Sequence, residues 1–214
     1  PAGIGRQAAA VGAAPAEIAR RHGLAVALRI EDAAWALLGM RAEAPEPNTG
    51  GGSITYDGDG IYKSIDAGAT WQQLGLKSVG TIGKVEVAPT NSNIIYTAAV
   101  GNVFQKNNNK GLYKSTDAGV TWNKVLFISD STSVNDVAVS PTDANTLYAC
   151  AWERISRPTG RVYGGITSNL YKSTDGGTNW TKLLADDANR GKITIDIPPT
   201  NANLLYISIA NKDG

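Results

Sequence analysis

Two kinds of apolar pattern alternate along most of the chain. Segments such as KVEVAP (84–89) and DVAVSP (136–141) alternate apolar and polar residues, which is typical of a β-strand with two unlike faces. The segments that follow them, NIIYTAAV (93–100) and TLYACAW (146–152), are continuously apolar, as expected for a strand covered on both faces. Proline with asparagine or aspartate separates the two segments of each pair, which predicts a tight turn and therefore a hairpin.

A further pair of strands completes each unit, and the unit repeats. The segments GIYKS (60–64), GLYKS (111–115) and NLYKS (169–173) each contain a tyrosine that is followed nine residues later by a tryptophan. Four short strands in a repeat of about fifty residues predict the blade of a β-propeller.

The repeat predicts an all-β domain over residues 46–214, a β-propeller segment of about three four-stranded blades in an incomplete ring. We expect an outer half-blade at 46–71, full blades at about 82–126 and 134–184, and an inner half-blade at 192–210. Propellers generally have four to eight blades, so this number indicates a piece of a larger propeller. Open sheet faces should then associate with missing blades or with another copy of the chain.

The first 45 residues have a different composition. They are rich in alanine and arginine and contain no serine, threonine, asparagine, lysine, tyrosine or phenylalanine. Good helix formers predict helices over 16–24 and 31–44, so residues 1–45 are interpreted as a helical segment of uncertain origin, either an appendage or foreign sequence.

An eight-residue motif, S-x-D-x-G-x-x-W, stands three times between the third and fourth strands. We expect its serine and aspartate to hold turn amides, its glycine to adopt a positive φ, and its tryptophan to pack between blades. A structural role is favoured because a catalytic motif would not recur at the same turn of each blade. The residues are Ser64, Asp66, Gly68, Trp71, Ser115, Asp117, Gly119, Trp122, Ser173, Asp175, Gly177 and Trp180.

The motif resembles the Asp-box, or bacterial neuraminidase repeat. With EPNTGGGS (46–53), KVLFISD (124–130) and AWERISRP (151–158), the chain also resembles bacterial sortilin-like secreted proteins that are often labelled glycosyl hydrolases. The resemblance implies a secreted, cell-surface or periplasmic protein with a polypeptide or carbohydrate ligand. We expect a non-enzymatic scaffold or binding module; the alternative is part of a secreted glycoside hydrolase, either polysaccharide-degrading or sialidase-like.

Only one interval of the repeat varies in length. Tyr96 and Tyr113 are 17 residues apart, whereas Tyr148 and Tyr171 are 23 apart, and the six extra residues fall within 153–169. This interval and the links between blades lie on the face opposite the Asp-box turns and contain every arginine after residue 45. Arginine suits planar anions, although a solvated polar loop explains the residues equally well. The candidate ligand-binding residues are Arg154, Arg157, Arg161, Tyr163 and Arg190.

Glycoside hydrolysis requires two carboxylates roughly 5–9.5 Å apart. The candidates on the same face are Glu153, Asp130 and Asp186, with Asp187, Lys106 and Lys110 beside them. The segment RIS (154–156) lacks the proline of the arginine-isoleucine-proline motif of sialidases, which argues against that activity.

Composition excludes several other functions. A net charge of +1 gives no basic field for nucleic acid, and no apolar run is long enough to span a membrane. One cysteine, Cys150, cannot form an intrachain disulfide, and the single histidine, His22, lies before the repeats. No metal site and no cofactor are predicted.

Overall fold

The computed structural model describes residues 35–40, 58–157 and 160–212, and within these ranges it contains strands and turns but no helix. The strands of the first two sheets are β1 (Trp35–Met40), β2 (Gly58–Ser64), β3 (Gln72–Gln73), β4 (Thr81–Val87), β5 (Ile95–Gly101), β6 (Gly111–Ser115) and β7 (Asn123–Leu126). The strands that follow are β8 (Thr132–Val139), β9 (Leu147–Glu153), β10 (Ile155–Arg157), β11 (Gly160–Val162), β12 (Leu170–Ser173), β13 (Thr181–Lys182), β14 (Arg190–Asp196) and β15 (Tyr206–Asn211).

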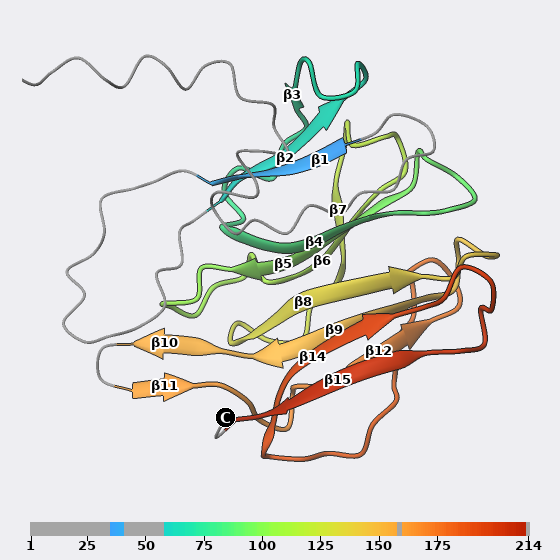
Figure 1. Cartoon of the computed structure of the whole chain (residues 1–214). Coiled ribbons are helices and arrows are strands. Elements are labelled where there is room, and N and C mark those ends of the chain that lie inside the picture. The colour runs from blue at the N-terminus through green and yellow to red at the C-terminus, as the bar shows by residue number, and fades with distance from the viewer. Residues whose placement is uncertain (1–34, 41–57, 158–159, 213–214) are drawn as a thin grey trace, which may run out of the picture.

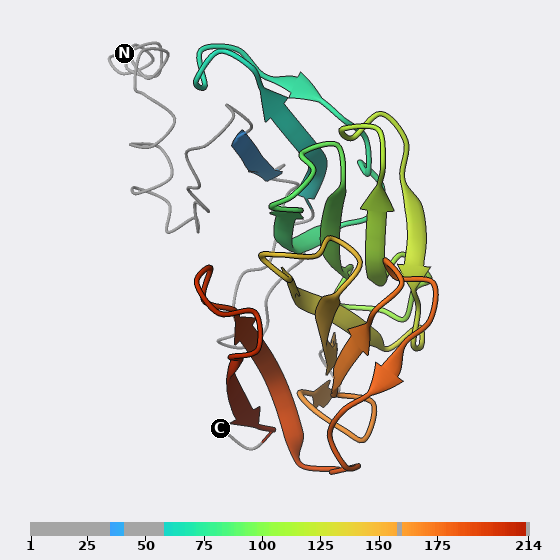
Figure 2. The same cartoon turned by 90° about the vertical axis from the view of Figure 1, so that its right-hand side faces the viewer.

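The sheets are antiparallel meanders that follow one another in chain order. Among the described residues, two sheets have four strands, β4-β5-β6-β7 and β8-β9-β12-β13; one has three, β1-β2-β3; and two have two, β14-β15 and the small hairpin β10-β11. Figure 1 shows them stacked from β1–β3 to β14–β15, and Figure 2 shows each sheet turned relative to its neighbour. This arrangement confirms the all-β propeller segment with an open ring. We call the four sheets other than the β10-β11 hairpin blades one to four, in chain order.

The predicted helix over 31–44 is wrong in its centre. Residues 35–40 form β1, which pairs with β2 in antiparallel register, Trp35 opposite Ser64 and Leu38 opposite Ile61. β1 thus occupies the place that β5 and β9 occupy in their blades. Helix propensity is a weak prior that strand pairing overrides. The other residues of the predicted N-terminal helical segment, and its boundary at residue 46, lie outside the described residues.

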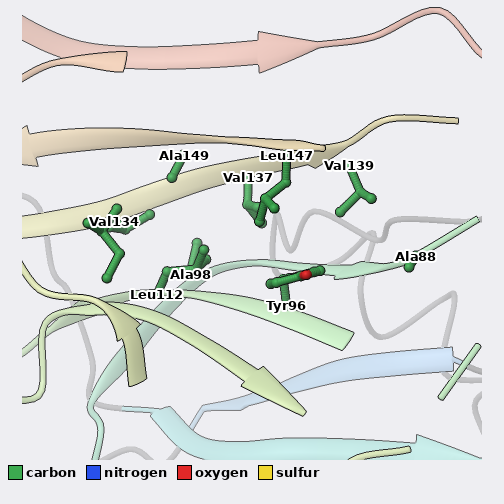
Figure 3. Packing of buried hydrophobic residues seen from close by; sticks show 10 residues of the cluster. Ala88, Tyr96, Ala98, Leu112, Val134, Val137, Val139, Leu147 and Ala149 are labelled. Carbon is green, nitrogen blue, oxygen red and sulfur yellow. The ribbon is translucent and has the colours of Figure 1, made fainter. Parts of the chain in front are cut away.

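The main core lies between blades two and three. The alternating strands predicted at 84–89 and 136–141 are the innermost strands of these blades, and Tyr96 and Ala98 of β5 face Val137 of β8 (Figure 3). The members of this cluster are Ala88, Tyr96, Ala98, Leu112, Leu126, Val134, Val137, Val139, Leu147 and Ala149. A second cluster joins blades three and four and includes Cys150, which is buried and unpaired. Blades two, three and four are therefore stabilised by apolar packing against one another.

The strand β15 departs from the expectation that every continuously apolar strand is covered on both faces. All residues of β5 are buried, but all residues of β15 are exposed, including Tyr206 at 60% and Ile209 at 47%. The difference has a simple cause, because in the described part of the chain β15 is an edge strand with no further blade against it.

The three Asp-box turns are built by one set of hydrogen bonds. In the second turn, Ser115 Oγ donates to Asp117 Oδ1 at 2.7 Å and accepts the Gly119 amide at 2.8 Å. Asp117 also accepts the amide and the hydroxyl of Thr121, at 2.8 and 2.6 Å. The residue before the glycine has a positive φ as well (Ala118, 58°), a strain that the sequence analysis did not anticipate. The first and third turns repeat this pattern.

These hydrogen bonds predict a low pKa for the aspartate of the Asp-box. Hydrogen bonds from Thr121 are the largest cause that lowers the pKa of Asp117 to about 2. Because the folded pKa is below the ordinary 3.8, the stabilisation is present above about pH 4 and is lost as the pH falls towards 2. We expect Thr121→Val to raise the Asp117 pKa towards 3.8, measured by NMR titration of the carboxyl carbon. The Asp66 pKa in the same sample is the control, and an unchanged Asp117 pKa would contradict the assigned cause.

The tryptophans of the second and third boxes connect successive blades. Trp122 Nε1 donates to the Leu74 carbonyl of blade one at 2.7 Å, and Trp180 Nε1 donates to the Val125 carbonyl of blade two at 2.9 Å. Trp71 donates to Gly68 of its own turn at 3.1 Å. All three side chains are partly buried. The box is therefore a turn and an inter-blade contact in one motif.

Candidate functional site

The candidate residues lie on the end of the propeller opposite the Asp-box turns, which we call the loop face. It consists of the blade-to-blade links 76–80, 127–131 and 183–189 and of the loops 102–110 and 154–169. Loops bond to the links between blades: the Asn107 amide of blade two donates to the Asp130 carbonyl at 3.0 Å, and the Arg154 amide of blade three donates to the Ser131 carbonyl at 3.1 Å. The loop face is thus a continuous surface.

The six extra residues of blade three form a hairpin. β10 pairs with β11, with Ser156 opposite Arg161 and Arg157 opposite Gly160. The hairpin is anchored on the loop of the preceding blade, because the Ser156 amide donates to the Val103 carbonyl at 2.8 Å and Ile155 is buried. The insertion therefore covers part of blade two.

The structure brings Asp130 and Glu153 to neighbouring strand ends. Glu153 is paired with Thr132, two residues after Asp130. Asp130 accepts the Ser131 hydroxyl at 2.8 Å and lies 3.5 Å from Lys106 Nζ. The two residues therefore stand at the same end of blade three, where the Asp130 carboxylate faces Lys106 of blade two.

A hydroxyl chain, which the sequence analysis did not identify, holds the Glu153 carboxylate. Thr167 donates to Glu153 Oε2 at 2.7 Å, and the hydroxyls of Thr167 and Thr132 are 2.7 Å apart. Glu153 Oε2 also lies so close to Gly165 that a Cβ there would be 2.1 Å from it. The repeat predicts that Thr132 lies at the start of a strand. The spacing of the repeat could not predict its partner Thr167, because Thr167 lies in the longer loop that the other blade lacks.

The residues on either side of Glu153 form an aromatic and cationic group, and Trp152 leaves β9 on the face opposite Glu153. The Arg154 guanidinium lies over the Trp152 ring, 4.6 Å from its centroid, and the Trp152 indole N–H donates to the Tyr163 carbonyl at 2.7 Å. Burial lowers the pKa of Arg154, and its Nε is buried without a hydrogen-bond partner among the described residues. Exposed Phe104 lies on the adjacent loop.

Lys110 is fully buried under this group. Its ammonium donates to the carbonyls of Val100 and Asn102, both at 3.0 Å, and to Ser133 Oγ at 3.3 Å. Burial is the main cause that lowers the pKa of Lys110 to about 8, and the nearby Arg154 adds to it. Lys110 therefore joins blades two and three from inside and does not face a ligand.

The remaining candidates do not join the group. Residues paired across two strands point to the same face, and successive residues of a strand point to opposite faces. Arg161 is paired with Ser156, the neighbour of Arg157, so the two arginines lie on opposite faces of the hairpin. Arg190 is 9% exposed and donates to the Ser168 carbonyl at 3.3 Å. Asp186 forms an ion pair with Lys182, and Asp187 accepts the Asn189 amide. The four arginines therefore do not converge on one anion.

The described residues contain no group of three His, Cys, Asp or Glu side chains that could hold a metal ion. Across the same ranges, no helix has the length and apolar character to cross a membrane.

Comparison with known proteins agrees with this geometry. The family model Sortilin-Vps10 (sortilin, neurotensin receptor 3) matches residues 59–212. The chain belongs to this family. The match confirms the sortilin-like, Asp-box type of propeller that the motif predicted.

Several relatives carry the name xyloglucanase. The protein of Hypocrea jecorina (strain QM6a) is 32% identical over 181 residues, which cover 74% of this chain and 20% of that protein. The protein of a Paenibacillus species is 30% identical over 144 residues, which cover 58% of this chain and 13% of that protein. The chain spans about a fifth or less of the length of these relatives. Their names favour the glycoside hydrolase alternative over a non-enzymatic scaffold.

A solved structure shares the fold. The crystal structure of an ancestral GH74 enzyme superposes with a TM-score of 0.54 at 20% identity, over 86% of this chain and 23% of that one. At this identity the likeness supports the propeller fold.

Proposed function

We propose that this chain forms part of the substrate-binding face of a secreted glycoside hydrolase that acts on a xyloglucan-like β-glucan. The observation that carries the proposal is that Asp130, Trp152 and Glu153 stand at one end of blade three, with exposed Phe104 on the loop of blade two. Relatives named xyloglucanase support the class of substrate.

The chemistry of the group suits a polysaccharide. Aromatic rings pack against the apolar faces of sugar rings, and fixed carboxylates and hydroxyls accept and donate hydrogen bonds to their hydroxyl groups. The hydroxyl chain through Thr167 holds Glu153 in one orientation. Asp130 and Glu153 are the pair that we assign to acid and base roles, since hydrolysis needs two carboxylates that flank one bond.

Binding is tested with xyloglucan oligosaccharides by titration calorimetry. We expect Phe104→Ala to weaken binding about tenfold, the effect of about 1.4 kcal/mol of lost ring contact. The matched control is Val120→Ala, since Val120 is an exposed apolar residue on the opposite, Asp-box face. Equal effects of the two substitutions, or no binding by the unchanged chain, would contradict the loop face as the binding surface.

Catalysis is tested separately by release of reducing ends from xyloglucan. We expect Asp130→Asn and Glu153→Gln each to lower the rate at least a hundredfold, as for loss of general acid–base catalysis, while binding changes less than threefold. Unchanged rates would remove these residues from the acid and base roles. Binding without any hydrolysis by the unchanged chain would favour the scaffold interpretation instead.

A further inference from the structure

A hollow lies on the loop face between blades one and two. It has a volume of about 270 Å³, the size for a single small ring rather than an extended chain. Its polar walls come from both blades: Asp59, Lys77, Ser78, Asn102, Asn107 and Asn109.

Hydrogen bonds fix these walls. Asn109 Nδ2 donates to the Ser78 carbonyl at 2.7 Å and so joins the two blades. Asn107 Nδ2 donates to the carbonyls of Asn102 and Gln105, at 2.8 and 3.0 Å. Asp59 accepts the Tyr62 hydroxyl at 2.7 Å, which holds its carboxylate. The hollow is therefore preformed, which lowers the entropy cost of binding.

The equivalent places in the other blades contain a cation of the protein itself. The residues just before the GIY, GLY and NLY segments are Asp59, Lys110 and Ser168. Between blades two and three, the buried Lys110 ammonium bonds to oxygens of both blades. Between blades three and four, the Arg190 guanidinium of β14 donates to the Ser168 carbonyl.

Between blades one and two the arrangement is reversed. In the repeat, Asp59 stands where blade two has Lys110. Arg190 is the first residue of the innermost strand of blade four and pairs with Asn211. The equivalent residue of blade two is Thr81, which pairs with Gly101. An acidic group and a hollow thus replace a buried cation.

We propose that this inter-blade pocket binds the protonated amine of an amine-bearing sugar, with Asp59 as the counter-ion and the other polar groups of its walls bonded to the sugar hydroxyls. This inference rests on the proposed glycan-binding role of the loop face, and it adds a site apart from Asp130 and Glu153. A charge-assisted hydrogen bond to a carboxylate is stronger than a neutral one, so the amine dominates recognition.

The test uses glucosamine, glucose and N-acetylglucosamine as probes in titration calorimetry. We expect glucosamine to bind at least tenfold more tightly than the two neutral sugars, and Asp59→Asn to abolish this difference. The asparagine keeps an acceptor for the Tyr62 hydroxyl, so the fold is preserved. Equal affinity for the three sugars, or a preference that survives in Asp59→Asn, would overturn the proposal.

Two further arms separate the alternatives. Lys77→Ala removes an exposed cation from the pocket wall and should strengthen glucosamine binding two- to threefold; weaker binding would contradict the assigned charge. Lysine amide tests the source of the amine, since binding as tight as that of glucosamine would overturn the sugar assignment. Phe104→Ala should leave glucosamine binding unchanged, and Asp59→Asn should leave xyloglucan oligosaccharide binding unchanged. The two variants therefore distinguish failure of the amine pocket from failure of the xyloglucan-binding surface.

Discussion

Replacing Trp122 by alanine is expected to lower the free energy of unfolding by about 2–3 kcal/mol, and the same change at Trp71 by less than half as much. The value for Trp122 is below the 3–5 kcal/mol typical of a fully buried tryptophan because its side chain is only partly buried.

The two tryptophans make a matched pair. Both occupy the last position of an Asp-box, but Trp122 donates to the Leu74 carbonyl of blade one, whereas Trp71 donates to Gly68 within its own turn. Loss of Trp122 removes ring packing against the neighbouring blade and leaves the Leu74 carbonyl without this donor. The difference between the two variants therefore measures the inter-blade part of the contact.

Urea unfolding monitored by circular dichroism gives both values. Equal losses for Trp122→Ala and Trp71→Ala would show that the tryptophan stabilises its own turn only. Trp180→Ala is a second check: Trp180 donates to the Val125 carbonyl of blade two and also to the Gly177 carbonyl of its own turn, so the loss should be at least as large as for Trp122.

The blade architecture could be predicted from the sequence because the repeat makes one pattern visible three times. Turn residues, strand periodicity and the fixed nine-residue spacing from tyrosine to tryptophan all indicate the same fold. The strand β1 was missed for the opposite reason: its sequence, WALLGM, has no asparagine turn before it and consists largely of residues that also form helices.

The candidate site was only partly predictable. The extra length in blade three indicated a loop, and that loop contains the β10–β11 hairpin and Thr167. Spacing alone could not show which arginines face outwards, because Arg154 stacks on Trp152 and Arg190 turns into the interval between blades. Side-chain direction depends on partners from other blades, which a single repeat does not encode.

Burial of Lys110 leads to the second large effect, a rise in stability with pH. Its folded pKa of about 8 lies below the unfolded value of 10.5, so between these values the unfolded chain binds more protons than the folded one. The free energy of unfolding then increases as the pH rises. For these two pKa values, the increase attributable to Lys110 is about 2 kcal/mol between pH 7.5 and pH 9.5.

The control is Lys110→Met, which keeps the length of the side chain and cannot titrate. This variant leaves the carbonyls of Val100 and Asn102 without their donor and is expected to be less stable at pH 7.5, but the pH dependence is the decisive measurement. Tyrosines with raised pKa values, such as Tyr96, oppose the rise in both proteins and cancel in the difference. If the free energy of unfolding changes by the same amount in both proteins from pH 7.5 to 9.5, the buried ammonium is not destabilised by its surroundings. A steeper rise in the unchanged chain would show that the same ammonium that joins blades two and three also makes their contact sensitive to pH.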